Sequence, residues 1–317
     1  MLLDHLLSRR LLIICGKGGV GKSVVGAALA LAARERGRRV LLVAIDSPLE
    51  ASRYLGSAPA GPRATEVQPG LSLVNLDPRR VMDEYIAHVV KIQLLARRIL
   101  DSPIYDRFFT AAPGLKELMT LGKLMVFEEA KERWSRRPLY DLVNLDAPAT
   151  GHGLSLLKVP TAASAAVPIG PVGHNARRIL SLLRNPKKTA LVIVAVPEEM
   201  AVVEAAQLHR LAADEVGIPV GAVILNQCHE RRFDQSQEAD VLRLAATGTD
   251  GRLDRGVRLA PALTAARRHI RRRKLTRFYQ TRLKRSVPAP LVGLPFLYRD
   301  ELGPAEVALL AERLGAS

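Results

Sequence analysis

The sequence predicts an α/β fold in which a doubly wound, mostly parallel sheet is flanked by helices. Two features of the 317-residue chain lead to this prediction. Short runs of β-branched and aliphatic residues, bounded by polar or turn residues, alternate along the chain with longer helical patterns. The strand runs are almost wholly apolar, which is expected where helices cover both faces of a parallel sheet.

The predicted elements follow one another in strand–helix order. The expected strands are Leu11–Cys15, Val40–Ile45, Leu71–Leu76, Tyr140–Leu145, Thr189–Val196, Val220–Leu225 and Ala289–Leu294. The expected helices are Lys22–Arg36, Arg79–Leu100, Leu115–Trp134, Glu198–Val216 and Pro304–Leu314. Only Ser57–Gly70, rich in Pro, Ala and Gly, has the composition of a linker. We therefore expect one domain over residues 1–317, with helical subregions at 79–135 and 158–188 as candidate client or partner regions.

The composition is that of an ordinary globular protein of the cytoplasm. Hydrophobic residues make up 48% of the chain and charged residues 25%. Cys15 and Cys228 are its two cysteines, which excludes a disulfide scaffold and a four-cysteine zinc site within one chain. No apolar run approaches the roughly 18 residues of a membrane span, and Met1–Arg10 lacks a cleavage-site pattern.

The formal net charge of +16 favours acidic partners, among them nucleotide, anionic lipid and nucleic acid. Much of it falls in the segment 267–285, where Ile270, Leu275, Phe278 and Leu283 recur at about one face of a helix. The first interpretation of this segment is the solvated outer face of a packed helix. Peripheral contact with an anionic membrane and binding of nucleic acid stay as alternatives, and single-stranded nucleic acid would need more stacking aromatics than Phe278 and Tyr279.

A glycine-rich run between the first strand and the first helix matches the phosphate-binding pattern G-x-x-x-x-G-K-[ST], and it consists of Gly16-Lys17-Gly18-Gly19-Val20-Gly21-Lys22-Ser23. Its backbone N–H groups and that of Val24 would surround phosphate oxygens. Lys22 would reach the β- and γ-phosphates, and the Ser23 hydroxyl would bind Mg²⁺. The following helix points its positive end at the same anion. The run therefore predicts binding and hydrolysis of Mg-ATP, and the alternative is a glycine-rich turn without nucleotide.

Two aspartates stand at strand ends, where ligands bind in parallel α/β sheets. Asp46 follows the second strand and Asp146 the fourth. Carboxylates at these places can hold the waters of Mg²⁺ and orient the attacking water. The alternative is that both residues only cap loops or helices.

Several segments resemble one family of ATPases. The run K-G-G-V-G-K-S resembles the loop of P-loop NTPases with a deviant Walker A motif. Asp146–Pro160 is similar to the switch II signature D-T-A-P-T-G-H of arsenite-pump ATPases (ArsA) and of the ATPases that target tail-anchored membrane proteins. Pro113–Glu117 resembles the P-G-x-x-E helix start of that family, and Leu225–Gln227 its V-N-Q strand end. Asp46-Ser47-Pro48 resembles its switch I D-P-A-H, with two positions altered and the histidine lost.

The resemblance implies an Mg-ATP-hydrolysing dimeric switch that handles a protein or membrane-protein client. It implies roles for residues at matching positions: Lys17, Asp46 and Lys22 in catalysis, Ser23, Asp46 and Asp146 at Mg²⁺, Thr150, Gly151 and His152 in the mobile switch, Asn226 at adenine, and Pro295 and Phe296 in a loop on the purine. Lys17 would reach the nucleotide of a partner subunit, in a homodimer promoted by nucleotide or with a related paralogue. A MinD- or ParA-like ATPase that acts at a membrane or nucleoid surface is the alternative.

The chain also departs from that family. It has no C-x-x-C zinc pair, no methionine-rich insert after switch II, and no three-cysteine site for arsenite. These absences argue against arsenite pumping, and compact bacterial members of the family are the better match. In 79–135, apolar residues recur at largely helical spacing, namely Val81, Tyr85, Ile86, Val89, Leu118, Leu121, Leu124, Met125 and Phe127. Core packing is their first interpretation, and an exposed client face is the alternative.

Overall fold

The computed structural model describes residues 2–45, 49–90, 92–112, 114–148, 150–167, 169–246 and 259–316. One eight-stranded sheet organises them, in the order β3-β4-β2-β5-β1-β6-β7-β8. Neighbouring strands are parallel except β3, which is antiparallel to β4. The strands are β1 Leu11–Gly16, β2 Val40–Ile45, β3 Thr65–Gln68, β4 Leu71–Leu76, β5 Leu142–Asp146, β6 Thr189–Ala195, β7 Val220–Cys228 and β8 Leu291–Pro295. The predicted fold class is confirmed.

All seven predicted strands are present, with ends that move by at most three residues. The eighth, β3, lies inside Ser57–Gly70, so the prediction of a linker there is wrong. Three of its four residues are polar, and the fourth, Val67, is only partly buried against the core. The short turn into β4 uses Gly70 at a φ of 78°. A short edge strand with one apolar residue lacks the apolar run by which the others are recognised.

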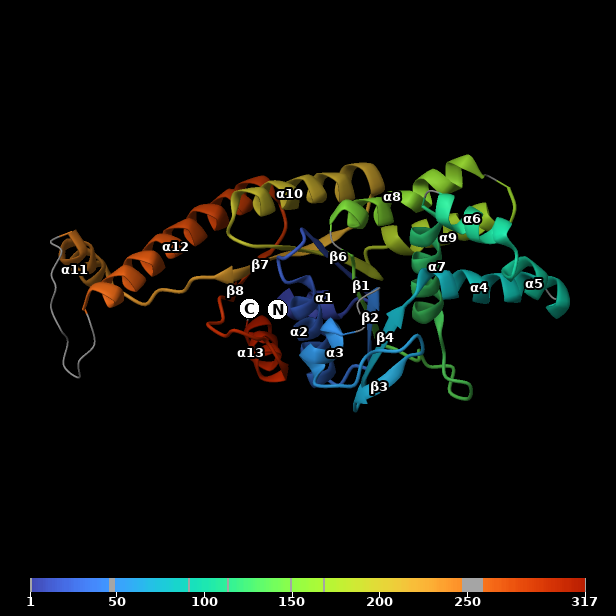
Figure 1. Ribbon diagram of the computed structural model, residues 1–317, viewed down its shortest axis with the longest axis horizontal. Coiled ribbons are helices and arrows are strands. Elements are labelled where there is room, and N and C mark those ends of the chain that lie inside the picture. The colour runs from blue at the N-terminus through green and yellow to red at the C-terminus, as the bar shows by residue number, and fades with distance from the viewer. Residues whose placement is uncertain are drawn as a thin grey trace.

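Helices cover both faces of the sheet (Figure 1). They are α1 Leu2–Leu7, α2 Lys22–Glu35, α3 Glu50–Leu55, α4 Pro78–Val89, α5 Gln93–Leu100, α6 Pro103–Ala111, α7 Leu115–Glu129, α8 Thr150–Ala166, α9 Pro171–Arg184, α10 Glu199–Arg210 with a π-helical continuation Leu211–Val216, α11 Gln235–Ala246, α12 Leu259–Ser286 and α13 Pro304–Gly315. Among the helices that the structure describes, none combines the length and apolar character needed to cross a bilayer.

Two predicted helices are shorter than expected. The single helix Arg79–Leu100 is wrong: α4 stops before Val90, which is extended (φ −87°, ψ 91°), and Ile92 ahead of α5 is extended as well (φ −91°, ψ 105°). Both side chains are β-branched, which restricts them in a helix. The helix predicted to reach Trp134 ends at Glu129, because Ala130 turns into extended backbone and its carbonyl accepts the N–H of Leu139 at 2.8 Å.

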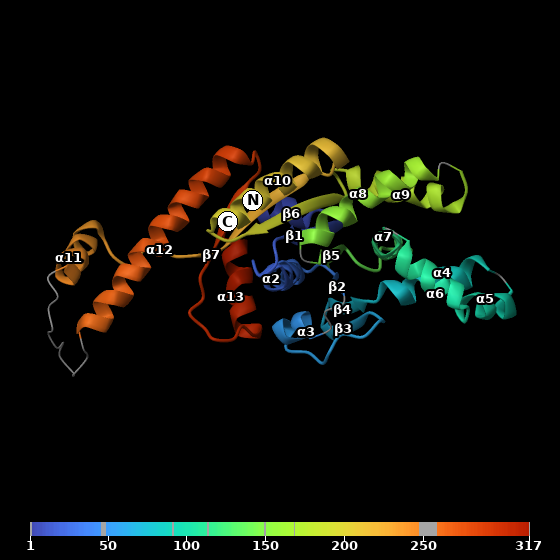
Figure 2. The ribbon, with the colours of Figure 1, turned by 45° about the horizontal axis from the view of Figure 1, so that its top comes forward.

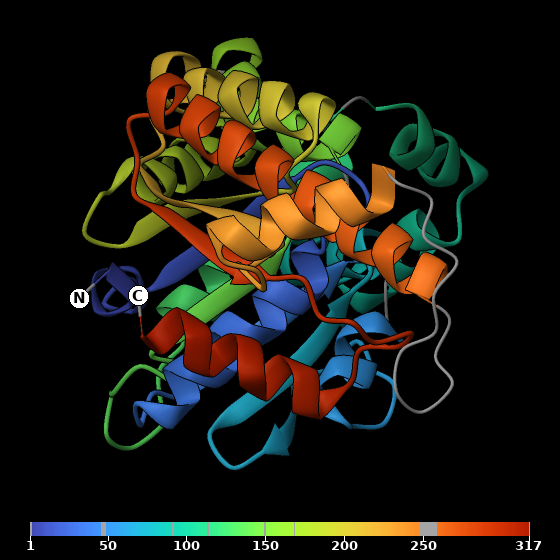
Figure 3. The same cartoon turned by 90° about the vertical axis from the view of Figure 1, so that its left-hand side faces the viewer.

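Alternate residues of the central strands enter two separate cores. Leu12 and Ile14 of β1 pack with α1, α2, α3 and α13, whereas Leu11 and Ile13 pack with α7 to α10 and the end of α12. Figure 3 shows α2 and α13 on one side of the sheet and α10 and α12 on the other. The near-continuous apolar strands follow directly from this two-sided cover.

The helices at the two ends of the molecule project away from the sheet. The pair α11 and α12 extends at one end, and α4, α5 and α6 gather at the other (Figures 1 and 2). A small third core of Met82, Tyr105 and Phe109 joins α4 to α6. Core packing was the first interpretation of the apolar residues in 79–135, and five are buried, namely Val81, Leu118, Leu121, Leu124 and Met125.

Candidate nucleotide site

The loop between β1 and α2 has a shape that only glycine permits at two positions. A Cβ on Gly16 would lie 2.2 Å from the carbonyl oxygen of Val194, and one on Gly21, whose φ is 87°, would lie 2.4 Å from Nδ2 of Asn226. No side chain caps the N-terminus of α2. The first N–H groups of this helix therefore remain available for an anion at the carboxyl end of the sheet.

Lys22 is held at the start of α2 with its ammonium turned into the loop. The residue is 8% exposed, and its Nζ donates to the carbonyl of Lys17 at 3.1 Å. Burial lowers the pKa of Lys22, and the Asp146 carboxylate opposes that effect. A buried cation among backbone donors favours a multiply charged anion as ligand.

Asp146, the last residue of β5, is buried beside Lys22 and Ser23. Burial raises its pKa to about 6, against the opposing effects of the Ser23 hydroxyl and the Lys22 ammonium. Its Oδ1 atom has no hydrogen-bond partner among the residues that the structure describes. A buried carboxylate oxygen without a donor costs free energy unless a ligand supplies the missing partner. A carboxylate and a hydroxyl on one side of a phosphate loop fit the oxygen preference of Mg²⁺.

Glu50 adds a second carboxylate that sequence reasoning missed. It is the first residue of α3, and its Oε2 accepts a hydrogen bond from Ser23 Oγ at 3.1 Å. The signal was available, because Glu50 lies four residues after Asp46 at the start of a helix that follows a strand end. Asp46 itself, with Ser47 and Pro48, lies outside the described residues, so its role stays a prediction.

Lys17 points away from Lys22 and towards α10. Its Nζ lies 3.4 Å from a carboxylate oxygen of Glu204, and the two side chains are 38% and 29% exposed. No local pattern in the sequence marks Glu204, because only the fold brings α10 to this loop. Val20 of the loop and Val24 of α2 are buried against the core, whereas Gly18 and Gly19 are exposed.

Asn226 lies against the phosphate loop. Its Nδ2 donates to the carbonyl of Val20 at 3.0 Å, and the residue is 5% exposed. The loop after β8 lies beside the end of β7, where the Phe296 N–H donates to the Cys228 carbonyl at 2.8 Å. The ring of Phe296 is stacked on His229, with centroids 4.8 Å apart.

A hollow of about 560 Å³ opens beside Phe296, Tyr298 and His229. The structure thus brings Asn226 to the loop, and it places Pro295 and Phe296 at the same carboxyl edge of the sheet. Contact of these residues with adenine stays a prediction.

Thr150, Gly151 and His152 form the first turn of α8, immediately after β5. Their side chains lie outside the described part of the structure. The helix that they begin contacts α7: a Cβ on Gly114 would lie 2.8 Å from Cγ2 of Val159. The backbone that follows Asp146 is therefore packed directly against the helical subregion 79–135.

Comparison with known proteins identifies a family. A model of the anion-transporting ATPase family matches residues 9–170. ATPase BagA of Mycobacterium tuberculosis (strain ATCC 25618 / H37Rv) is 29% identical over 262 residues, which is 80% of this chain and 76% of that protein. ATPase GET3C of Arabidopsis thaliana is 25% identical over 267 residues, 69% of this chain and 67% of that protein.

The arsenical pump-driving ATPase of Escherichia coli is 26% identical over 234 residues, which is 68% of this chain but 39% of that protein. The family match spans more than half of the chain and includes the phosphate loop, Asp146 and the start of α8. With the predicted parallel sheet present and the loop at its carboxyl edge, the chain belongs to the anion-transporting ATPase family and is an ATPase of that family.

Proposed function

We propose that the protein is an Mg-ATP-hydrolysing dimeric switch that handles an apolar protein client. The observation that carries the hydrolytic part is the arrangement of Lys22, Ser23 and Asp146 at one loop: a buried cation, a hydroxyl and a carboxylate oxygen without a partner. Among the residues that the structure describes, Lys22 and Ser23 have protein partners and Asp146 Oδ1 has none. A triphosphate with its metal ion has charges that match all three groups.

The chain's own groups then have distinct tasks. The loop N–H groups and Lys22 hold the β- and γ-phosphates, and Ser23 and Asp146 hold Mg²⁺, with Asp46 beside them. The metal ion supplies positive charge at the phosphates, which lowers the cost of the developing transition-state charge. Asp46 orients the attacking water. Asn226 and the hollow beside Phe296 take the base.

The client part rests on apolar side chains exposed at the end of the molecule that carries α4, α5 and α6. Ile92, Leu94 and Ile104 are 65%, 66% and 78% exposed. Ile169, between α8 and α9, is 86% exposed. We infer that these exposed apolar side chains together form the surface for an apolar partner. We place client binding in the subregions 79–135 and 158–188, and the contact of α7 with α8 couples them to the switch.

A membrane-positioning role through the last helix has less support. Val307, Leu310 and Leu314 of α13 are buried against α2. The apolar face of this helix is therefore used for packing and is not free to enter a bilayer.

The nucleotide assignment is tested by Lys22→Ala. Calorimetry should show no ATP binding and a phosphate-release assay no hydrolysis, because the β- and γ-phosphates lose their nearest cation. Lys187→Ala, at an exposed lysine away from the loop, is the matched control and should behave like the wild type. ATP affinity unchanged in Lys22→Ala would overturn the assignment.

The client assignment has its own test. A fluorescent apolar helical peptide should bind the wild type with ATP present, and the double substitution Leu94→Ser and Ile104→Ser should weaken binding about tenfold or more. Leu309→Ser, at a 43% exposed position on α13, is the control. Equal effects of the two variants would place the client elsewhere.

A further inference from the structure

Helix α12 carries a charge that its packing does not explain. Its 28 residues include ten arginines and lysines and no aspartate or glutamate. At 1.5 Å per residue the helix is about 42 Å long, so this positive charge is spread along a substantial part of the surface. A helix at the surface needs an apolar face against the body of the protein, and polar residues of either sign suffice on its other face.

The helix has two different faces. Leu263, Ile270, Thr276 and Leu283 are buried at intervals of six or seven residues and attach α12 to the body of the protein. Away from this face, exposed residues recur every three or four positions and therefore form a single stripe along the helix. The stripe consists of Thr264, Arg267, Arg271, Lys274, Phe278, Thr281 and Arg285. The stripe is basic along its length, with one aromatic ring near its centre.

Few of these charges are neutralised by residues that the structure describes. Arg273 is paired with Glu238 at 2.6 Å, and Arg282 lies 3.9 Å from Glu199. Within the described ranges, no carboxylate lies in ion-pair distance of the other basic residues of α12, namely Arg267, Arg268, Arg271, Arg272, Lys274, Arg277, Lys284 and Arg285. Like charges at these spacings repel and lower the stability of the helix. An anionic surface outside the protein would remove that cost.

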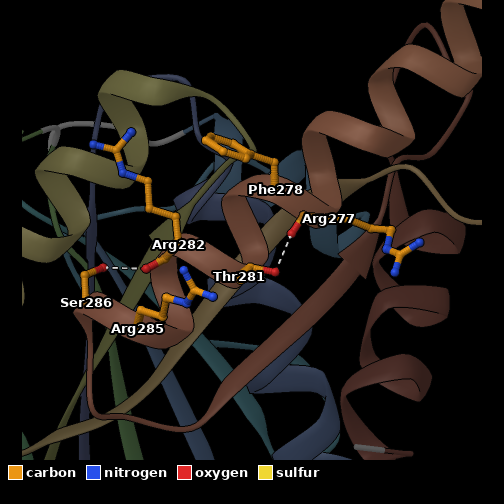
Figure 4. Close-up of a pocket in the computed structure, with 6 residues that line it drawn as sticks. All are labelled: Arg277, Phe278, Thr281, Arg282, Arg285 and Ser286. Carbon is orange, nitrogen blue, oxygen red and sulfur yellow. Dashed lines mark hydrogen bonds between the residues drawn. The ribbon is translucent and has the colours of Figure 1, made fainter.

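The stripe also exposes apolar surface. The sequence pattern put Leu275 and Phe278 on about one face with Ile270 and Leu283. Ile270 and Leu283 are buried, but Leu275 and Phe278 are 41% and 59% exposed. Figure 4 shows the Phe278 ring beside a shallow groove of about 610 Å³, with Arg277 and Arg282 extending on either side of it. A second groove of about 450 Å³ lies further along the helix and is lined by Arg267, Arg271 and Lys274 among others.

We propose that this stripe docks the protein on an anionic lipid bilayer. Arg271, Lys274 and Arg285 contact lipid phosphates, and Phe278 with Leu275 enters the headgroup region. Each basic residue near an anionic leaflet raises the affinity for the membrane about fivefold. An inserted apolar side chain adds binding free energy that salt does not screen. A single-stranded nucleic acid would need several stacking rings, whereas Tyr279 packs on the core and leaves Phe278 alone on the stripe.

The test is vesicle co-sedimentation with the full chain. Wild-type protein should bind vesicles containing about one third phosphatidylglycerol and should not bind pure phosphatidylcholine vesicles. The triple substitution Arg271→Gln, Lys274→Gln and Arg285→Gln should lower the partition coefficient about 100-fold. A second triple variant, Arg63→Gln, Arg97→Gln and Arg98→Gln, removes the same charge at exposed sites away from α12 and should lower it less than about tenfold.

Phe278→Ser separates apolar insertion from charge. It should weaken binding several-fold at low salt and remove the part of binding that persists in 0.5 M salt. The proposal is overturned if the wild type ignores anionic vesicles, or if both triple variants lose binding equally. It is also overturned if the α12 triple variant loses affinity for a random duplex DNA while vesicle binding is unchanged, because the stripe would then serve nucleic acid.

Discussion

The ammonium of Lys17 lies 3.4 Å from the carboxylate of Glu204 in the same chain. The loop thus holds its second lysine against α10, although the family resemblance gives that lysine a target on a partner subunit. Both side chains are partly exposed, so the pair contributes little, on the order of 0.5 kcal/mol after solvent screening. A triphosphate on a facing subunit offers more charge than Glu204 does. We infer that Lys17 exchanges Glu204 for nucleotide when two subunits meet.

Glu204→Gln should therefore promote dimerisation. Without the competing carboxylate, Lys17 is free, and the ATP-dependent dimer association constant should rise about two- to fivefold. Sedimentation velocity at several protein concentrations measures this. Glu199→Gln is the control, since it removes a carboxylate from the same helix that lies near Arg282 and not near Lys17. A weaker dimer in Glu204→Gln would show that Glu204 holds Lys17 in its working position.

Asp146 should make the nucleotide-free protein less stable as the pH rises. A carboxyl group whose pKa is raised contributes stability that is complete below the ordinary value of 3.8 and is lost as the pH rises through about 6. Asp146→Asn cannot ionise, so at pH 7.5 it should be more stable than the wild type by up to about 3 kcal/mol, with no gain at pH 4. Urea unfolding across this pH range gives the comparison.

The stability change expected for Asp141→Asn at neutral pH has the opposite sign to that of Asp146→Asn. Although Asp141 is partly buried, hydrogen bonds from Arg39 hold its pKa below the ordinary value. Its contribution is therefore present at neutral pH and is lost as the pH falls through that lowered value, and Asp141→Asn should be less stable than the wild type at pH 7.5. If Asp146→Asn also loses stability there, the Asp146 carboxylate has a partner that the structure does not contain.

Most of the sheet was predictable because a parallel strand covered on both faces has to be apolar throughout. That constraint acts on each strand separately, so Val40–Ile45 and Leu71–Leu76 were predicted to the residue. It acts only weakly on β3, an edge strand in which Val67 and Gln68 are partly buried and the other two residues are exposed. In α12 the pattern was misleading: Leu275 is five residues beyond the buried Ile270, and five residues turn a helix by about 140°, which carries Leu275 away from the core.

The phosphate loop was predictable because its ligands are consecutive in the chain. Glu50 and Glu204 belong to the same site but come from α3 and α10, and only the packing of those helices on α2 and β6 brings them to the loop. Glu50 has a weak local signal, since it lies four residues after Asp46, whereas Glu204 has none in the sequence. The site was therefore found from its contiguous part, and its surroundings needed the structure.

Glu50→Ala should weaken the response to Mg²⁺. The Ser23 hydroxyl donates a hydrogen bond to Glu50, which leaves the lone pairs of the serine oxygen for a metal ion. Without Glu50 the hydroxyl is free to rotate. Loss of one such hydrogen bond corresponds to about a fivefold rise in the Mg²⁺ concentration that half-stabilises the ATP complex. Thermal unfolding with ATP and increasing Mg²⁺ measures it. Glu301→Ala, at an exposed carboxylate elsewhere, is the control and should leave the half-stabilising Mg²⁺ concentration unchanged.

The last prediction concerns action of Lys17 across a dimer. Two subunits of net charge +16 repel one another, and bound nucleotides offset part of that repulsion. ATP should therefore promote a homodimer, less so at high salt because the attraction is screened. Lys17→Ala should keep most of its ATP affinity and lose turnover. Asp46→Asn should also bind ATP and lose turnover by a factor of about 100 or more, because the attacking water is no longer oriented.

Mixing these two inactive variants should restore part of the activity. In a mixed dimer, the site on the Lys17→Ala chain keeps its own Asp46 and receives an intact Lys17 from the Asp46→Asn chain. Random exchange makes about half of the dimers mixed, each with one complete site, so the mixture should reach roughly a quarter of the wild-type rate. Lys17→Ala mixed with the double variant Lys17→Ala, Asp46→Asn is the control: neither chain supplies Lys17, so its mixed dimers contain no complete site and should stay inactive. Mixed dimers that form but hydrolyse no faster than either parent would show that Lys17 acts within its own chain.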